Sequence, residues 1–290
     1  MLTYFIYCMF ISDNHGHVNP VNGLGPKIVA KRFAEKGGSF MVIVSLLPSD
    51  FGLNAGDISD VEKLYKLTIE SSRLVSESGV KSVPVIGLHP AECHKLLERG
   101  WSINDVKNHM IKAIDVASQF IKRGEAIGIG EIGRPHWDVG NDIVELCNDV
   151  ILYAMEIARD INAVVHLHLE RRGRETVDSI KVLADKANIT KEKVVLHHAA
   201  PDMVGIGASY GFSPSVPIGR KGEFDAAIQL GPIFVVESDF VDDPKRTGSV
   251  IPPWTLAKKL KDYVRMGIIE EDFIDSICKI NMEKIYGITI

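Results

Sequence analysis

The feature that most constrains this chain is a series of short apolar segments, separated by longer segments with the periodicity of amphipathic helices. The apolar segments are rich in β-branched residues and cover residues 4–12, 40–46, 83–87, 126–130, 163–168, 193–197, 212–215 and 233–237. Such an alternation is typical of a parallel sheet with helices outside it. Because strands buried on both faces appear as continuous apolar runs, eight such units predict a closed (β/α)8 TIM barrel, an α/β fold.

Two of the helical segments have recognisable ends. Ser59 followed by Glu62 forms a capping box, which predicts that a helix begins there. Ser102 followed by Asp105 predicts the start of another helix, and Gly124 is placed to end it in a left-handed conformation. Both helices then lie between predicted strands, as a barrel requires.

The main alternative fold is an open, doubly wound sheet that binds a dinucleotide. Residues 128–133 match the G-x-G-x-x-G pattern that seats a pyrophosphate in such folds. The pattern must open a helix, yet Arg134 and Pro135 follow it, and proline biases the preceding residue away from helix. The sequence therefore favours the barrel.

Length and charge limit the classes of function. The 290 residues suit a single barrel domain over residues 1–290, without a linker or internal repeat. The net charge of −5 gives no general attraction to nucleic acid or to an anionic membrane, although a local basic groove stays open as an alternative. The apolar residues 1–11 are too few to span a bilayer and lack the features of a signal peptide.

The cysteine pattern bears on the compartment. Cys8, Cys93, Cys147 and Cys278 are scattered and form no C-x-x-C pair, which argues against a zinc knuckle and against a disulfide framework. A reducing interior fits this pattern best, so we predict a cytoplasmic location. The sequence gives no indication of the oligomeric state.

Polar side chains gather at the ends of five predicted strands, and in a barrel these ends meet at the face that carries the active site. They are Asp13 to His17 after the first strand, Glu131 after the fourth, His166 and His168 in the fifth, His197 and His198 at the sixth, and Asp239 after the eighth. Imidazoles and carboxylates together are the ligands of divalent transition metals. We therefore expect a metal site there.

His15 and His17 are two residues apart, so in an extended chain both imidazoles point to the same side and can share a cation. The alternative is a pair of surface histidines in a turn. Glu131 follows an apolar strand, where a carboxylate is costly unless a cation meets it. The alternative for Glu131 is an ion pair with Arg134.

The two histidine pairs leave a choice of ligand. His168 lies nearer the rim than His166, which would point deeper into the barrel, so we prefer His168. Only one of the adjacent residues His197 and His198 can face inward while the strand stays regular. We select His197 and keep His198 as the alternative.

Asp239 follows an apolar strand that ends in polar residues, a suitable place for a carboxylate that holds a metal and moves protons. The alternative is that Asp239 caps a helix. Asp242 and Asp243 are predicted to be solvated loop charges.

In this order, the motifs resemble those of the TatD-related metal-dependent hydrolases of the amidohydrolase superfamily, and in particular an archaeal-type branch. The resemblance covers nearly the whole chain. It is carried by Asp13-Asn14-His15-Gly16-His17, Gly87-Leu88-His89-Pro90, Gly130-Glu131-Ile132-Gly133, Val164 to His168, Val195-Leu196-His197, Glu237-Ser238-Asp239, and Asn281 with Ile285-Tyr286-Gly287.

The resemblance implies a ligand set for two divalent metal ions: His15, His17, Glu131, His168, His197 and Asp239, with Glu131 reaching both ions. A gapless match from Asp160 onward favours His168 over His166. Zinc is preferred for such ligands, with manganese, cobalt and nickel as alternatives.

The chain departs from the family pattern in two places. Arg134-Pro135-His136-Trp137 replaces the usual Leu-Asp-Tyr after the glutamate, a form associated with the archaeal-type branch. The arginine expected soon after the fifth-strand histidine is out of register, because two residues precede Arg171.

The expected reaction is hydrolysis of an amide, ester or phosphoester bond in a small-molecule or nucleotide-type substrate, by water that two cations activate. Asp239 and Glu131 are the predicted catalytic residues, with Asp239 moving the proton. His89, Arg134 and His136 flank strand ends and are predicted to contact the substrate. The alternatives are a TatD-like deoxyribonuclease acting on DNA and a non-catalytic scaffold that retains a metal.

Overall fold

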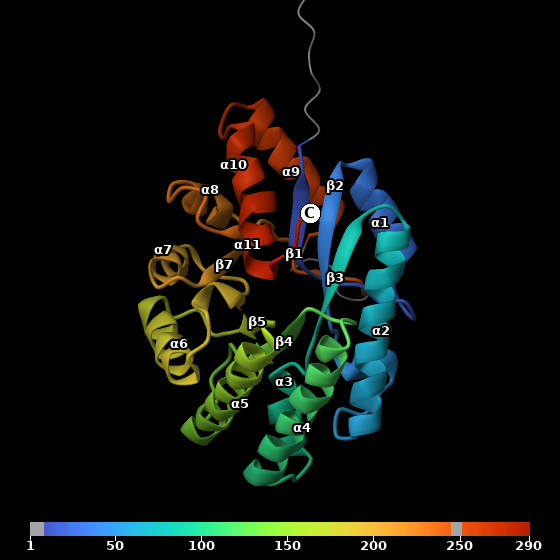
Figure 1. Cartoon of the computed structure of the whole chain (residues 1–290), viewed down its shortest axis with the longest axis vertical. Coiled ribbons are helices and arrows are strands. Elements are labelled where there is room, and N and C mark those ends of the chain that lie inside the picture. Colours follow the sequence, from blue (N-terminus) through green and yellow to red (C-terminus); the bar gives the residue numbers. More distant parts are fainter. Residues whose placement is uncertain (1–8, 245–250) are drawn as a thin grey trace, which may run out of the picture.

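The computed structural model describes residues 9–244 and 251–290, and its strands form one curled parallel sheet (Figure 1). The strands of these residues are β1 (Ile11–His17), β2 (Gly38–Val44), β3 (Lys81–Ile86), β4 (Gly128–Gly133), β5 (Val164–His168), β6 (Val194–Leu196), β7 (Ser213–Pro217), β8 (Val235–Glu237) and β9 (Phe240–Val241). They pair in the order β8-β7-β6-β5-β4-β3-β2-β1-β9.

The sheet closes into a ring through its last two strands. Only Ser238 and Asp239 separate β8 from β9, and Asp239 has a φ of 52°, so the two strands are parts of one interrupted eighth strand. β8 pairs with β7, while β9 pairs in parallel with β1. The predicted TIM barrel is confirmed.

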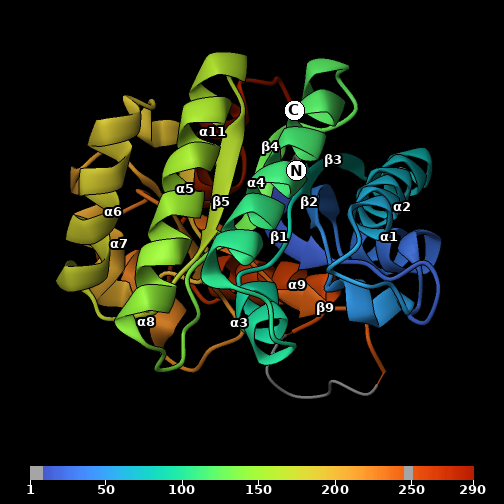
Figure 2. The same cartoon turned by 90° about the horizontal axis from the view of Figure 1, so that it is seen from below.

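Helices surround the strands, with α1 and α2 on one side and α6 and α7 on the opposite side (Figure 1). In the described residues they are α1 (Pro26–Glu35), α2 (Ile58–Glu77), α3 (Ala91–Glu98), α4 (Ile103–Lys122), α5 (Asn141–Ile161), α6 (Arg174–Ala187), α7 (Pro201–Ser209), α8 (Glu223–Ile228), α9 (Pro253–Arg265), α10 (Glu271–Asp275) and α11 (Asn281–Tyr286). Figure 2 shows α4 and α5 side by side on the outside of the sheet. None of these helices is long and apolar enough to cross a membrane.

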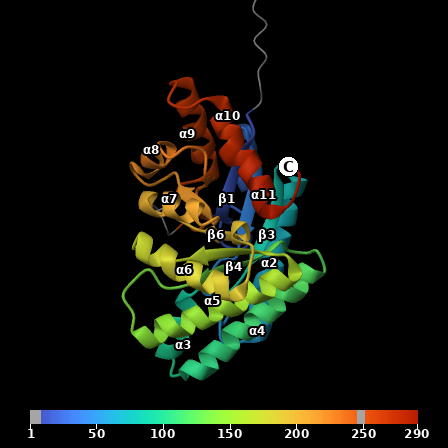
Figure 3. The same cartoon turned by 60° about the vertical axis from the view of Figure 1, so that its left-hand side comes forward.

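The barrel interior is filled by apolar side chains that point inward from the strands, and α11 covers one end of it. The cluster consists of Phe40, Val42, Val44, Val85, Val164, Val195, Val235, Met282, Ile285 and Tyr286. Figure 3 shows α11 lying across this part of the sheet. Polar strand ends therefore occupy the opposite end.

Two strands end three or more residues beyond the end that the apolar pattern predicted. The first was expected at residues 4–12 but runs over Ile11–His17 in the described part, and residues 4–8 lie outside that part. The fourth ends at Gly133 and not at Gly130. Each extension begins with a polar residue, Asp13 or Glu131, where the apolar pattern ends, so the H-x-H motif and Glu131 lie within strands.

Of the two predicted helix starts, one is wrong and one is confirmed. Asp57, and not Ser59, caps α2, because its carboxylate accepts a hydrogen bond from the Ser59 amide. The Ser102 cap of α4 is confirmed, since its hydroxyl accepts from the Asp105 amide at 3.1 Å. Gly124 has the predicted left-handed conformation, with a φ of 74°.

The rejected dinucleotide pattern forms β4 and opens no helix. Gly133 serves close packing of two strands, because a Cβ there would lie 1.9 Å from the carbonyl oxygen of His168. Because glycine has no Cβ, the Arg134 amide can donate to the His168 carbonyl oxygen at 2.8 Å. The expectation of a single domain over residues 1–290 stays a prediction.

Candidate metal centre

Glu131 lies at the centre of the polar strand ends, and its Oε1 atom faces two histidines of β1. The Nε2 atoms of His15 and His17 are 3.2 Å apart, and Oε1 lies 3.8 and 3.6 Å from them. A tetrahedral ion bound at about 2.1 Å would hold its ligand atoms about 3.4 Å apart. The three residues, here called the β1 group, therefore fit a divalent cation.

The Oε2 atom of Glu131 faces a second set of ligands. It lies 2.7 Å from His168 Nδ1 and 3.4 Å from His197 Nε2. His198 Nε2 is 3.3 Å from His168 Nδ1, and these three imidazoles can converge on one ion. We call His168, His197 and His198, together with Glu131 Oε2, the β5–β6 group.

Asp239 lies beside both groups. Its Oδ1 atom is 3.6 Å from His197 Nε2, and its amide donates to the His15 carbonyl at 3.0 Å. Asp239 precedes β9 and no helix, so the structure excludes the helix-cap alternative.

The adjacent histidines both reach the centre, because the sixth strand is not regular there. β6 ends at Leu196, and His198 has a left-handed φ of 39°. The ring centroids of His197 and His198 lie 4.3 Å apart, and that of His198 lies 4.6 Å from His168. The condition that only one of the two can face inward therefore does not apply.

Burial controls the protonation of these groups. It lowers the pKa of the buried histidines His15, His166, His197 and His198, and it lowers the pKa of the half-buried His89 to about 3. Neutral imidazoles offer the lone pairs that a metal requires. Burial also raises the pKa of Asp239 to about 6, which suits a group that accepts and releases a proton near neutral pH.

Two residues expected to contact the substrate lie against the centre. His89 Nδ1 accepts a hydrogen bond from the Ala91 amide, so the ring proton is on Nε2, which lies 3.8 Å from Glu131 Oε1. His136 Nδ1 lies 2.9 Å from His168 Nε2. His89 thus presents a donor to the β1 group, while His136 supports the β5–β6 group.

Arg134 is directed elsewhere. Its guanidinium makes a bidentate pair with Glu170 at 2.7 and 2.9 Å and also donates to Asn148 and Ser179. Glu170, and not Glu131, is therefore the carboxylate partner of Arg134. Arg134 and His136 still line a common cavity of about 560 Å³ with Trp137 and Glu170.

The expectation that Asp242 is a solvated loop charge is wrong. Its side chain is buried and accepts hydrogen bonds from the amides of Asn19, Leu24 and Gly25. A loop 217 residues or more away in sequence supplies these amides, so no local pattern could reveal them. Asp242 fixes the loop after β1.

Sequence reasoning assigned no role to two carboxylates, Glu237 and Asp13, that are buried behind the ligands. Glu237 lies 2.9 Å from His197 Nδ1 and accepts from the His198 amide at 2.7 Å. Asp13 accepts from the amide and hydroxyl of Ser238. The available signal was a carboxylate inside or beside an apolar strand, since such a group needs buried donors.

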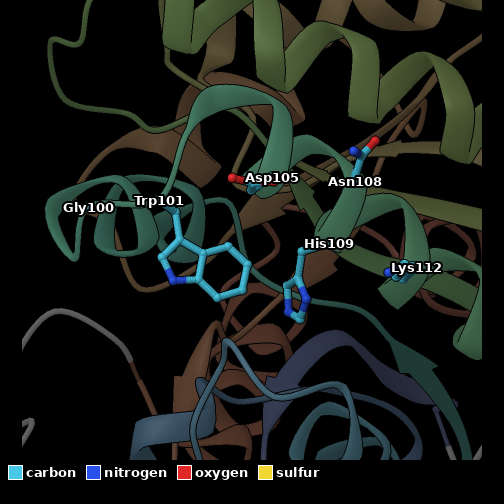
Figure 4. Close-up of a pocket in the computed structure, with 6 residues that line it drawn as sticks. All are labelled: Gly100, Trp101, Asp105, Asn108, His109 and Lys112. Atoms are coloured by element: carbon cyan, nitrogen blue, oxygen red, sulfur yellow. The ribbon is translucent and has the colours of Figure 1, made fainter.

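A second cavity, of about 520 Å³, lies among the outer helices (Figure 4). Trp101 and His109 stand side by side in it, with ring centroids 5.4 Å apart. His109 Nε2 is 2.6 Å from the Ala55 carbonyl oxygen, to which it donates. Its lining lies on and just before α4, away from the strand ends, so it is separate from the candidate centre.

A TIM barrel with histidines and carboxylates converging at its strand ends is the architecture of a metal-dependent hydrolase. The sequence matches the family model described as TatD related DNase over residues 12–287. The chain belongs to this family, and it is a metal-dependent hydrolase.

The chain is similar to one curated relative in sequence and to two solved structures in fold. An uncharacterized protein of Methanocaldococcus jannaschii is 31% identical over 284 residues, which cover 97% of this chain and 96% of the relative. The TatD homologue YJJV of Escherichia coli has a similar fold, with a TM-score of 0.66 at 16% identity, over 97% of this chain and 99% of that one. The organophosphorus hydrolase of Deinococcus radiodurans has a TM-score of 0.63 at 12% identity, over 96% and 93% of the two chains.

Proposed function

We propose that this protein is a hydrolase with a binuclear metal centre, in which Glu131 joins the two ions. One observation carries the proposal: the two carboxylate oxygens of Glu131 face separate sets of imidazoles. His15 and His17 would hold one ion, and His168 and His197 the other. Asp239 would complete the shell, as its position beside His197 supports.

The donor set decides which ions fit. Neutral imidazoles and carboxylates, without a thiolate, suit zinc first and manganese, cobalt or nickel as alternatives. Bound there, two such ions would lower the pKa of water and polarise the bond to be cleaved.

The predicted cytoplasmic location rests on the cysteines. The thiols of Cys93, Cys147 and Cys278 form no disulfide in the described residues, and the location stays a prediction.

The chain itself would move the proton and orient the substrate. Asp239, with a pKa raised by burial to about 6, would accept the proton of the attacking water and return it to the leaving group. His89 would donate from Nε2 to a substrate oxygen. His136 lines the cavity next to His168 and would border the substrate.

Arg220 favours an anionic substrate. Burial lowers the pKa of His136 and His198, and the charges of His168 and Arg220 lower both further, so Arg220 lies within electrostatic range of these two imidazoles. Arg220 lies in the loop after β7. In barrels, the loops after the seventh and eighth strands commonly hold phosphate groups. A small phosphoester or nucleotide-type substrate is therefore proposed ahead of a neutral amide or ester.

DNA is the second candidate substrate, because the matching family model is described as a DNase. The net charge of −5 opposes it. Ionic strength separates the two: cleavage of DNA should fall steeply between low and physiological salt, whereas turnover of a small ester should change little.

The test is to strip the protein with a chelator, reload it with zinc or manganese, and measure bound metal and turnover together. We expect two ions per chain and metal-dependent hydrolysis of p-nitrophenyl phosphate or its diester. Linear DNA at several salt concentrations tests the second candidate. Failure to take up metal would overturn the proposal, and bound metal without turnover of any probe would favour the scaffold.

A further inference from the structure

A continuous chain of buried hydrogen bonds lies beneath the centre and joins its two groups. Its members are His15, His166, Tyr286, Asn14, Ser215, Glu237 and His197, all nearly inaccessible to solvent. None of the five residues between the two terminal histidines belongs to the proposed ligand set. What they determine is where protons lie on the ligands.

Asn14 gives the chain its direction, because the two ends of its amide differ. Its Nδ2 atom donates to Ser215 Oγ at 3.0 Å, and its Oδ1 atom accepts from the Tyr286 hydroxyl at 2.7 Å. One end of Asn14 thus supplies a proton and the other receives one. The series of hydrogen bonds therefore has two arms that begin at Asn14. Asn14 is the acceptor in the arm through Tyr286 and the donor in the arm through Ser215.

The first arm runs to the β1 group. The Tyr286 hydroxyl has given its only hydrogen to Asn14, so toward His166 Nε2, 2.7 Å away, it acts as the acceptor. His166 then carries its proton on Nε2, and its Nδ1 lone pair faces His15 Nδ1 at 3.3 Å. His15 must therefore be protonated on Nδ1. Its Nε2 lone pair is left free, facing Glu131 and the other histidine of the group.

The second arm runs to the β5–β6 group. Ser215 accepts from Asn14, so its own hydrogen goes to Glu237, with which it forms a hydrogen bond. Glu237 thus receives hydrogen bonds from Ser215 and from the His198 amide, and these two donors favour its charged form, which accepts from His197 Nδ1, 2.9 Å away. His197 is therefore protonated on Nδ1, and its Nε2 lone pair is free to face Glu131.

The reverse orientation of Asn14 would disable the first group. Tyr286 would then donate to His166, His166 would donate to His15 Nδ1, and the ring proton of His15 would move to Nε2. A protonated Nε2 cannot bind a metal. Only one direction of the chain leaves both terminal histidines able to act as ligands.

We propose that Asn14 is a positioning residue that sets the tautomers of His15 and His197, through Tyr286 on one side and Ser215 on the other. The effect on metal binding rests on the proposed binuclear centre. The consequence is specific: each arm serves one ion. The C-terminal helix, through Tyr286, thereby supports the β1 group alone.

The test compares two single-atom deletions with matched controls. Tyr286→Phe breaks the first arm, and Ser215→Ala breaks the second. Two control variants remove hydroxyl groups outside the chain of hydrogen bonds. Tyr263→Phe removes a hydroxyl that is bonded to Asp225. Ser213→Ala, on the same strand as Ser215, removes a hydroxyl that is bonded to the main-chain carbonyl of Glu192. Stepwise zinc affinities are measured by competition with a chromophoric chelator, with thermal melts to verify folding.

Loss of partners that orient metal-binding histidines weakens a metal by about 10- to 100-fold. We expect Tyr286→Phe and Ser215→Ala each to weaken one of two ions by that factor, with controls unchanged. In a His17→Ala background, which removes the first ion, Tyr286→Phe should have no further effect while Ser215→Ala still does. Equal weakening of both ions by either variant, or no weakening by both, would overturn the proposal.

Nitrogen-15 NMR of the metal-free protein tests the same proposal without a metal. The wild type should show His15 and His197 protonated on Nδ1, and each variant should disturb only the histidine of its own arm. A His15 ring protonated on Nε2 in the wild type would contradict the inference. Absence of metal uptake by the wild type would instead overturn the proposed function, so the two failures are distinguishable.

Discussion

The β1 group and the β5–β6 group share the carboxylate of Glu131, but their histidines come from the strands in different ways. His15 and His17 come from one strand at alternating positions, so the strand period alone brings them together. His168 ends β5, whereas His197 and His198 follow the end of β6. The first group thus follows from local geometry, and the second depends on where a strand stops.

The second group also has one imidazole more than the first. His198 lies close to His168, yet its Nδ1 atom is buried without a hydrogen-bond partner in the described part of the chain. A buried donor without a partner costs about 1–3 kcal/mol unless a ligand satisfies it. We therefore expect the β5–β6 group to tolerate the loss of His198 better than the β1 group tolerates the loss of either of its histidines.

The largest effect should come from the residue that the groups share. Glu131→Gln removes the charge that faces both, and we expect loss of both ions and a fall in kcat of roughly 10³-fold, about 4 kcal/mol. Metal content by mass spectrometry and turnover of the phosphoester probe measure this. Retention of one tightly bound ion would show that Glu131 serves a single site.

The next effect separates the groups. His17→Ala and His168→Ala should each reduce the metal content by one ion per chain and lower kcat by roughly 10²-fold. The absorption spectrum of cobalt-loaded protein distinguishes which site remains. If both variants lost the same ion, the two groups would be one site.

The spare imidazole predicts a smaller loss. His198→Ala should keep two ions, weaken the second by less than about 10-fold, and reduce turnover less than His197→Ala does. Chelator competition on the two variants side by side measures the difference. A full loss of one ion in His198→Ala would make His198 an essential ligand.

The smallest catalytic effect should come from outside the centre. Glu170→Gln leaves the buried guanidinium of Arg134 without its carboxylate, which should lower the free energy of unfolding by about 3 kcal/mol. Turnover should fall only a few-fold, through His136 and the β5–β6 group, while the affinity of the β1 group stays unchanged. Urea unfolding and stepwise metal titration together check this, and a weakened β1 group would contradict it.

The sequence by itself determined the barrel and much of the candidate centre. Apolar runs predicted the strand series because each barrel strand is buried on both faces. The spacing of His15 and His17 predicted a shared side because residues alternate along a strand. Glu131 was singled out because a carboxylate after an apolar strand needs a partner. Asp239 was singled out because it follows a strand that ends in polar residues, where a carboxylate can hold a metal and move protons. The structure brings His15 and His17 to Glu131 and Asp239 to His197, while their roles stay predictions.

Only the tertiary structure decided which side chains satisfy one another. Asn14 meets Tyr286 across 272 residues and Ser215 across 201, and Asp242 caps a loop from the far end of the chain. Local rules describe period and exposure but not the identity of a distant partner. Hydrogen bonds are directional and short-ranged, so their partners exist only once the barrel has closed.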